Sequence, residues 1–287
     1  MEKYKYTGES KQIDGHWVHR IVALKDFECN GHKVSQGSYG GWLEKMENLA
    51  QEGTCWVFDD AVVMENSHVV ENVGIFGNSV IFGNACIKGN AQVFGGSTVY
   101  DFARVGGNAK LEESYVFGRA EVAGWAHVDE SSVYEKASVG GWALVENSEV
   151  HGRCLICDNS FVRRSCCSGH AMISGCCIVD RSVIGGGAMV YGQAKIISSD
   201  INHTSDYIVF NNNWSSVRYF TYVFPSRMWA VGCFYGNSEQ LLQKAAKDSP
   251  EKATMYALFV ALVNAMENLT KGEPALCLDR IAGLKKL

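Results

Sequence analysis

Residues 61–111 read AVVMENSHVVENVGIFGNSVIFGNACIKGNAQVFGGSTVYDFARVGGNAKL and repeat with a period of six. An aliphatic side chain stands at every sixth position: Val63, Val69, Ile75, Ile81, Ile87, Val93, Val99, Val105 and Leu111. A small side chain precedes most of them by two positions: Ala61, Ser67, Ser79, Ala85, Ala91, Ser97, Ala103 and Ala109. An α-helix cannot keep a period of six on one face, whereas a chain that bends every six residues can. The stretch therefore predicts a solenoid of short strands, with about eighteen residues in each three-sided coil.

The same pattern continues beyond residue 111, with spacings of five mixed among the sixes. Its later aliphatic positions are Val116, Val122, Val128, Val133, Val139, Ile156, Val162, Ile173, Ile184, Val190 and Ile196. About eight coils fit between Cys55 and Ile196, which makes a column on the order of 35–40 Å long. Gly-Asn pairs at 77–78, 83–84, 89–90 and 107–108 suit the corners, because both residues adopt the left-handed backbone conformation at low cost.

These features predict an all-β solenoid, a parallel β-helix that occupies residues 58–200. Residues 1–57 are expected to cap its first coil, and residues 201–287 to form a small C-terminal α+β domain. None of the three prolines lies in the repeat, where the next rung needs every backbone N–H.

Composition excludes several classes of protein. The chain has 287 residues and a formal charge of −5, so a basic stripe for non-specific duplex binding is not expected. It contains no run of about eighteen apolar residues that would span a membrane. The first residues, MEKYK, lack the apolar core of a secretory signal, and the eleven cysteines then predict reduced thiols in a cytoplasm.

The N-terminal segment has the composition of a β-rich cap. Residues 17–24, WVHRIVAL, predict a strand, and Asn30-Gly31 predicts a hairpin turn. The end of a β-helix exposes unpaired backbone and apolar side chains, so another segment has to cover it. Trp42 and Trp56 are the expected plugs.

The C-terminal segment loses the period of six. Residues 207–236 predict three or four short strands joined by tight turns. Ser238 is the expected N-cap of a helix to Lys247, and Ser249-Pro250 opens a longer helix to about residue 268. The buried face of the longer helix is expected to carry Met255, Leu258, Phe259, Leu262, Val263 and Met266.

Several short motifs of the cap carry a family resemblance. Residues 21–27 (IVALKDF), Gly40-Gly41-Trp42, Asn48-Leu49, Gly53 and 55–57 (CWV), followed by the hexads, resemble the YdcK-like proteins. These belong to the left-handed β-helix, hexapeptide-repeat class. The resemblance covers roughly residues 15–200 and implies a left-handed helix, a trimeric assembly and a link to acetyltransferases. The C-terminal third resembles a module of proteins encoded by phages and prophages.

Aromatic side chains follow the inward aliphatics and should point outward. Phe76 and Phe94 are one coil apart, as are Phe82 and Tyr100, so each pair predicts a short ladder. Trp125 and Trp142 occur in equivalent Gly-Trp-Ala contexts and should stack at one corner. Such ladders either stabilise the rungs or form a contact between subunits, and we favour the contact because exposed apolar strips usually mark interfaces.

Catalytic candidates come from the resemblance, because acyltransferases of this class use a histidine as general base. The repeat contains His68, His127, His151 and His170, of which His127 and His170 are the candidates if the chain is an acyltransferase. No carboxylate pattern accompanies them in the sequence, and no long loop projects from a coil to cover acyl-CoA. The sequence therefore favours a protein without catalytic activity and predicts no cofactor.

Cysteines and arginines gather in the last coils. Cys154, Cys166 and Cys177 fall where a small inward residue belongs, so packing is favoured over a zinc site and no metal is predicted. Arginine forks suit phosphate or carboxylate groups. The candidate anion ligands are Arg153, Arg163 and Arg164, with Arg181 one coil further on. Trp214, Arg218 and Tyr219 are the ligand candidates of the C-terminal domain.

Three functions remain open at this point. The first is a non-catalytic homo-oligomer, in a host cytoplasm if phage-encoded, that sequesters a small anionic, nucleotide-like signal used in host defence. The second is a hexapeptide-repeat acyltransferase that uses acetyl-CoA. The third is a structural scaffold that binds a host protein through its aromatic ladders.

Overall fold

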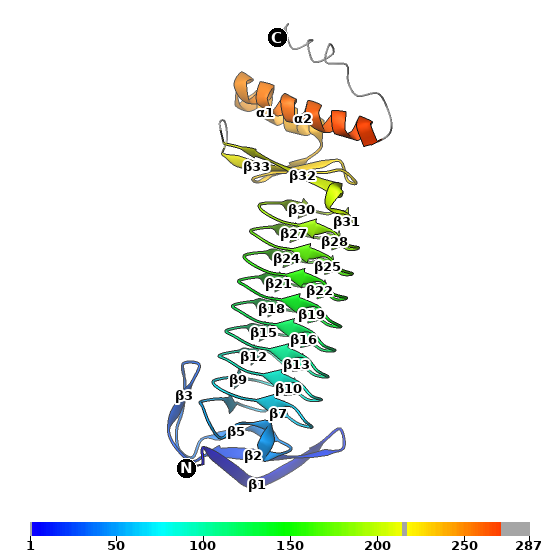
Figure 1. Cartoon of the computed structure of the whole chain (residues 1–287). Coiled ribbons are helices and arrows are strands. Elements are labelled where there is room, and N and C mark those ends of the chain that lie inside the picture. Colours follow the sequence, from blue (N-terminus) through cyan, green and yellow to red (C-terminus); the bar gives the residue numbers. More distant parts are fainter. Residues whose placement is uncertain (1, 214–216, 271–287) are drawn as a thin grey trace.

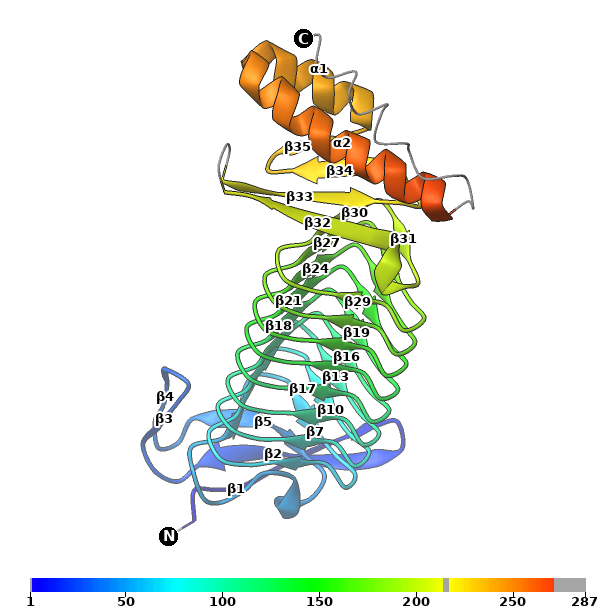
Figure 2. The same ribbon diagram turned by 45° about the horizontal axis from the view of Figure 1, so that its top comes forward.

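The computed structural model of the chain describes residues 2–213 and 217–270. It is a column built from a left-handed parallel β-helix, with about nine coils in the described residues (Figure 1). A β-rich cap closes one end, and a small sheet with two helices covers the other (Figures 1 and 2). The sequence predicted about eight coils because the aliphatic positions of the repeat were followed only as far as Ile196. The structure continues the last coil to β31 (Asp200–Ile201).

The coils form three faces of parallel two- or three-residue strands. The first face holds β7 (Val62–Val63), β10 (Val80–Ile81), β13 (Thr98–Val99), β16 (Tyr115–Val116), β19 (Ser132–Val133), β22 (Glu149–Val150), β25 (Cys166–Cys167), β28 (Val183–Ile184) and β31. The second face holds β8 (His68–Val69), β11 (Cys86–Ile87), β14 (Arg104–Val105), β17 (Glu121–Val122), β20 (Ser138–Val139), β23 (Leu155–Ile156), β26 (Met172–Ile173) and β29 (Met189–Val190). The third face holds β6 (Trp56–Val57), β9 (Gly74–Ile75), β12 (Gln92–Phe94), β15 (Lys110–Glu112), β18 (His127–Asp129), β21 (Leu144–Glu146), β24 (Phe161–Arg163), β27 (Ile178–Asp180) and β30 (Lys195–Ile197).

The five-residue spacings of the sequence fall at one corner, between the third and the first face. Ile81 pairs with Val99, eighteen residues on, whereas Val99 pairs with Val116, seventeen residues on. The earlier coil turns this corner with Gly95 and Gly96, both at positive φ, whereas the next coil uses the single positive-φ residue Glu113. A coil of seventeen residues therefore has one residue fewer at this corner, and the inward register of all three faces is unchanged.

The interior contains the predicted aliphatic and small side chains. The aliphatic positions from Val63 to Ile201 are almost completely buried, and so are the small residues beside them. Cys154 and Cys177 pack in this core as predicted. The prediction for Cys166 was wrong by one residue: Cys167 points inward, and Cys166 lies on the outside of the first face.

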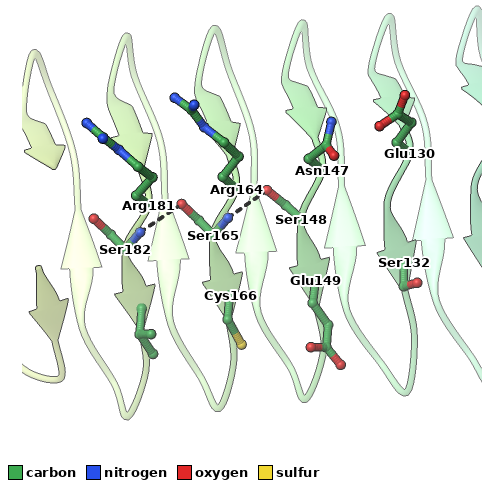
Figure 3. A pocket seen from close by; sticks show the side chains of 11 residues that line it. Glu130, Ser132, Asn147, Ser148, Glu149, Arg164, Ser165, Cys166, Arg181 and Ser182 are labelled. Atoms are coloured by element: carbon green, nitrogen blue, oxygen red, sulfur yellow. Dashed lines mark hydrogen bonds between the residues drawn. The ribbon is translucent and has the colours of Figure 1, made fainter. Parts of the chain in front are cut away.

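A ladder of buried serines runs along the inside of the corner between the third and the first face. From Ser97 to Ser182, each serine hydroxyl accepts a hydrogen bond from the backbone N–H of the serine one coil on, at 2.9–3.2 Å, and the last of these donors is Ser199. From Ser114 onward each hydroxyl also donates to a carbonyl two residues back in its own coil. The links between Ser148, Ser165 and Ser182 are drawn in Figure 3. This ladder satisfies backbone groups that the sharp corner would otherwise leave unpaired.

Replacing Ser148 by alanine should lower the free energy of unfolding by about 1–2 kcal/mol, because it takes away the acceptor of the buried N–H of Ser165 and removes one of the two hydrogen bonds that the carbonyl of Glu146 accepts. Urea unfolding followed by circular dichroism measures the effect. Ser132→Ala changes a half-exposed serine on the outside of the same corner and should stay within about 0.5 kcal/mol of the wild type. Equal losses in the two variants would show that the ladder adds nothing.

The N-terminal cap extends the sheet of the first face by three strands and adds a separate two-stranded hairpin. It comprises β1 (Tyr4–Ile13), β2 (His16–Ala23), the hairpin of β3 (Phe27–Cys29) and β4 (His32–Val34), β5 (Tyr39–Leu43) and a 3₁₀ turn over Met46–Asn48. The predicted strand and hairpin turn are confirmed in β2 and at Asn30-Gly31. Trp56 is buried in the core and plugs the coil. Trp42 packs instead on the outside of the first face, with Val18, Val62 and Met64.

The C-terminal domain lies across the other end of the column. Its described part has a four-stranded antiparallel sheet of β32 (Tyr207–Asn212), β33 (Arg218–Val223), β34 (Met228–Val231) and β35 (Phe234–Gly236), preceded by a 3₁₀ turn (Thr204–Asp206). The helices α1 (Ser238–Asp248) and α2 (Pro250–Thr270) cover the sheet on the side away from the coils (Figure 2). Neither has the length and hydropathy that would carry the described chain through a lipid bilayer.

Two details of the helices differ from the expectation. Asn237, and not Ser238, caps α1: its side chain accepts the backbone N–H of Gln240 at 2.9 Å. In α2 the predicted Phe259 and Val263 are buried, but Tyr256 and Val260 complete the buried face. Leu258 and Leu262, which were predicted to be buried, are exposed. The helix is apolar on nearly all sides, so its sequence does not define which side meets the sheet.

Candidate functional site

A cluster of charged residues, here called the arginine corner, consists of Arg163, Arg164 and Arg181 around Asp180. Arg163 and Asp180 end the paired strands β24 and β27, and Arg164 and Arg181 each open the turn that follows. Both turn residues have positive φ, 48° and 52°, the conformation that this shortened corner requires. The repeat thus places four charged side chains on two neighbouring coils.

Asp180 holds the arginine corner together. Its side chain is only 5% exposed and accepts hydrogen bonds from Arg163 at 3.0 Å and from Arg164 at 2.7 and 3.1 Å, with Arg181 at 3.6 Å. Burial by itself would raise the pKa of this carboxyl, but the hydrogen bonds and charges of Arg163 and Arg164 outweigh it and lower the pKa. The carboxylate therefore stays ionised, and three guanidinium groups share one negative charge.

The arginine corner borders a shallow hollow of about 680 Å³ on the first face. Figure 3 shows Arg164 and Arg181 side by side on neighbouring coils, pointing in the same direction, with Asn147 and then Glu130 in the same row. The side chains of Arg164 and Arg181 are 50% and 55% exposed, so solvent reaches both. Two guanidinium groups on adjacent coils can both donate hydrogen bonds to one oxyanion from the same side. Two carboxylates, those of Glu130 and Glu149, also line the hollow and limit how far negative charge on a ligand can extend.

The other predicted anion ligands lie elsewhere. Arg153 stands at the corner between the first and the second face, in a row with Arg119, Lys136 and His170. The structure therefore brings Arg163 and Arg164 together with Arg181 but leaves Arg153 apart. The spacing of seventeen residues between Arg164 and Arg181 could have indicated that these two lie together, because residues one coil apart share a corner.

The predicted ligand residues of the C-terminal domain also separate. Arg218 and Tyr219 are neighbours on β33, so their side chains leave opposite faces of the sheet. Tyr219 faces the last coil, and Arg218 lies beside Gly232. Trp214 lies outside the described residues. The hollow at the arginine corner and the cleft at Tyr219 share no lining residue, and Arg218 lines neither of them.

One of the two candidate histidines does have a carboxylate partner, contrary to the expectation. His127 Nε2 lies 3.9 Å from the carboxylate of Glu112, which stands one coil away and two residues along the third face. In a coil of seventeen residues, two residues that are fifteen positions apart lie on neighbouring coils and two positions apart along the strand. The sequence separation of Glu112 and His127 could therefore have indicated this contact. His170, the other candidate, is exposed in the row of basic residues that contains Arg153. In the described chain, no group of three or more potential metal ligands gathers at one place.

The predicted aromatic ladders are confirmed as stacks. Phe76 stacks on Phe94 with ring centroids 4.6 Å apart, and Trp125 stacks on Trp142 at 4.9 Å. The longest ladder runs over five coils: Phe82, Tyr100, Phe117, Tyr134 and His151. The rings of a ladder cover one another's faces, so they present mainly their edges to a partner.

The ladders differ in how much of their aromatic surface is exposed to solvent. Phe76 points outward as predicted, but it is buried because His32 of the N-terminal hairpin packs on it. The side chains of Trp125 and Trp142 remain 53% and 60% exposed. The tryptophan pair is therefore the largest solvent-accessible apolar contact among the predicted interface residues.

Comparison with known proteins gives one local similarity. No family model matches the chain. A stretch of 71 residues, 22% of this chain, is 34% identical to the uncharacterized acetyltransferase YdcK of Escherichia coli strain K12. The match spans 21% of that protein, about a fifth of its length. Together with the coil geometry, it supports a hexapeptide-repeat β-helix protein.

Proposed function

We propose that this chain is a non-catalytic, oligomeric binding protein whose arginine corner holds the oxyanion of a small ligand. The observation that carries the proposal is the charge of the corner. Three guanidinium groups surround a single ionised carboxylate, which leaves these four side chains together with a net charge of +2. Like charges so close together repel each other, and a bound anion would relieve that repulsion.

The two exposed arginines have different relations to the fold. Arg164 gives Asp180 two hydrogen bonds and so supports the corner, whereas Arg181 approaches the same carboxylate only at 3.6 Å. Arg181 is therefore the residue best able to turn toward a ligand without loss of structure. A phosphate or carboxylate group fits this pair, because a guanidinium fork binds either one through two parallel hydrogen bonds.

The ligand class includes the signal molecules suggested by the phage resemblance. A nucleotide-derived messenger of host defence carries phosphate groups, and a protein that sequesters it needs no catalytic group. This form of the proposal predicts that the bound molecule is released chemically unchanged when the protein is denatured.

Replacing Arg181 by glutamine should weaken anion binding at least tenfold, which corresponds to about 1.4 kcal/mol. Isothermal titration of the full chain with pyrophosphate, ADP-ribose and cyclic di-AMP measures the affinity, and mass spectrometry of the recovered ligand detects any turnover. Arg153→Gln is the matched control, because it removes the same charge at another corner. Failure of the wild type to bind any of the three anions, or equal weakening by both variants, would overturn the proposal.

A second candidate function has a specific observation in its favour. The Glu112 carboxylate beside His127 is suited to orient the imidazole as a general base, and the locally similar E. coli protein carries the name acetyltransferase. Both side chains of this pair are exposed on the outside of the third face, so a neighbouring subunit would have to complete the site. Acetyl transfer from acetyl-CoA that disappears in His127→Gln, but persists in His68→Gln, would establish this function in place of the first.

A further inference from the structure

A second cleft lies where the coils meet the C-terminal domain. Here called the tyrosine cleft, it has a volume of about 610 Å³ and is bounded by Tyr191, Tyr207 and Tyr219, with Gln193, Thr204 and Cys176 at its rim. Figure 2 shows β32 and β33 crossing the end of the column above β29. The cleft lies at this junction between the sheet and the last coils. Clefts of this size between two structural units are the usual places for small-molecule binding.

The tyrosines come from separate elements and have distinct roles. Tyr207 opens β32 and is fixed: its hydroxyl donates to the carbonyl of Met189 at 3.1 Å and accepts the backbone N–H of Tyr191 at 3.2 Å. Burial is the main cause that raises the pKa of Tyr207 to about 12, so its phenol stays neutral. Tyr191, after β29, and Tyr219, on β33, are both exposed at the cleft. The cleft thus has a rigid aromatic floor and two accessible aromatic walls.

The charge of the tyrosine cleft separates it from the arginine corner. Among the described residues that line it, none is a lysine, an arginine, an aspartate or a glutamate. A phosphate group would find no counter-charge there, and burying an unpaired charge is costly. The amide of Gln193 and the backbone N–H of Gly192 supply neutral hydrogen-bonding groups instead, whereas both backbone groups of Gly175 are bonded to Asp158 and Asn159.

We propose that the tyrosine cleft binds a neutral, planar heteroaromatic ring, of the class of a nucleobase or nucleoside. Aromatic side chains bind such rings through their faces and edges, largely independently of sequence or substituents. Tyr191 and Tyr219 supply the apolar contact, and the neutral polar groups at the rim pair with the heteroatoms of the ring. This site is distinct from the arginine corner and does not depend on it.

Titration of the full chain with adenosine tests the proposal, with ribose as the matched compound that lacks the ring. Adenosine should bind and ribose should not. Tyr191→Ala and Tyr219→Ala should each weaken adenosine binding at least fivefold. Tyr115→Ala removes an equally exposed tyrosine from the first face, away from the cleft, and should leave the affinity unchanged. Circular dichroism verifies that each variant is folded.

The outcomes separate this proposal from the anion site. Arg181→Gln should leave adenosine binding intact, and Tyr191→Ala should leave pyrophosphate binding intact. No adenosine binding by the wild type at millimolar concentration, or equal losses in Tyr115→Ala and Tyr219→Ala, would overturn the tyrosine cleft alone. Adenosine binding that is lost in Arg181→Gln would also overturn it, because the base would then bind at the arginine corner.

Discussion

Replacing Asp180 by asparagine should lower the free energy of unfolding by about 1.5–3 kcal/mol at pH 7, the range for hydrogen bonds to charged groups. The buried carboxylate accepts bonds from Arg163 and Arg164 and lies close to Arg181. Asparagine has nearly the same shape, but it carries no charge and offers one acceptor oxygen in place of two. The variant therefore keeps the packing and leaves three guanidinium groups to repel one another.

The effect of Asp180 should depend on pH with a defined sign. The pKa of Asp180 in the folded protein lies below its ordinary value, so its stabilising contribution is complete above the unfolded pKa of about 3.9. The contribution is lost as the pH falls from that value through the folded pKa. Urea unfolding of wild type and Asp180→Asn should thus differ most at pH 7 and converge at strongly acidic pH.

A matched control separates the arginine corner from general acid effects. Asp200 is exposed on the last coil of the first face, and Asp200→Asn should change the stability by less than about 0.5 kcal/mol at either pH. A constant difference between wild type and Asp180→Asn across the acid range would mean that the ionised carboxylate does not stabilise the fold.

Replacing both Trp125 and Trp142 by serine should convert the proposed homo-oligomer, a trimer by the family resemblance, into a monomer. The two stacked indoles are more than half exposed in the single chain, which is unusual for such large apolar side chains. Each buried interface tryptophan typically contributes about 2–4 kcal/mol to association. The loss of two of them raises the dissociation constant far above the concentration of a dilute sample.

Light scattering and native mass spectrometry of the purified chain measure this change. Phe102→Ser is the matched control, because Phe102 is an equally exposed aromatic residue at another corner, where the guanidinium of Arg119 lies over its ring. Phe102→Ser should remain oligomeric. A monomeric wild type, or an unchanged oligomer in the double variant, would remove the tryptophan pair from the interface.

The sequence was sufficient for the architecture of the column because each coil repeats the same local requirement. An inward aliphatic such as Val93 lies beside its equivalents Ile75 and Leu111 one coil away on either side, so the period alone defines these neighbours. The same argument correctly paired Phe76 with Phe94 and Trp125 with Trp142. Cys166 was misplaced because adjacent cysteines at 166 and 167 leave the inward position ambiguous by one residue.

The candidate site was predictable only in part, because contacts between coils depend on the exact coil length. Arg163 and Arg164 were identified as candidates, but Asp180 was not recognised as their partner, and neither was Glu112 as the partner of His127. Both contacts join residues fifteen to seventeen positions apart. The sequence grouped Arg153 with these arginines. It stands at a different corner because it comes after a strand of the first face and not of the third.

The sequence by itself determined the solenoid, since a strict period of aliphatic, small and corner residues permits only stacked coils. The tertiary structure decided which surfaces are available: the N-terminal hairpin covers Phe76, the C-terminal sheet selects one side of α2, and the junction of sheet and coil creates the tyrosine cleft. The physical reason is the range of the interactions. Repetition encodes contacts between neighbouring coils, whereas the docking of a cap depends on how two separately folded surfaces fit together, which no local pattern specifies.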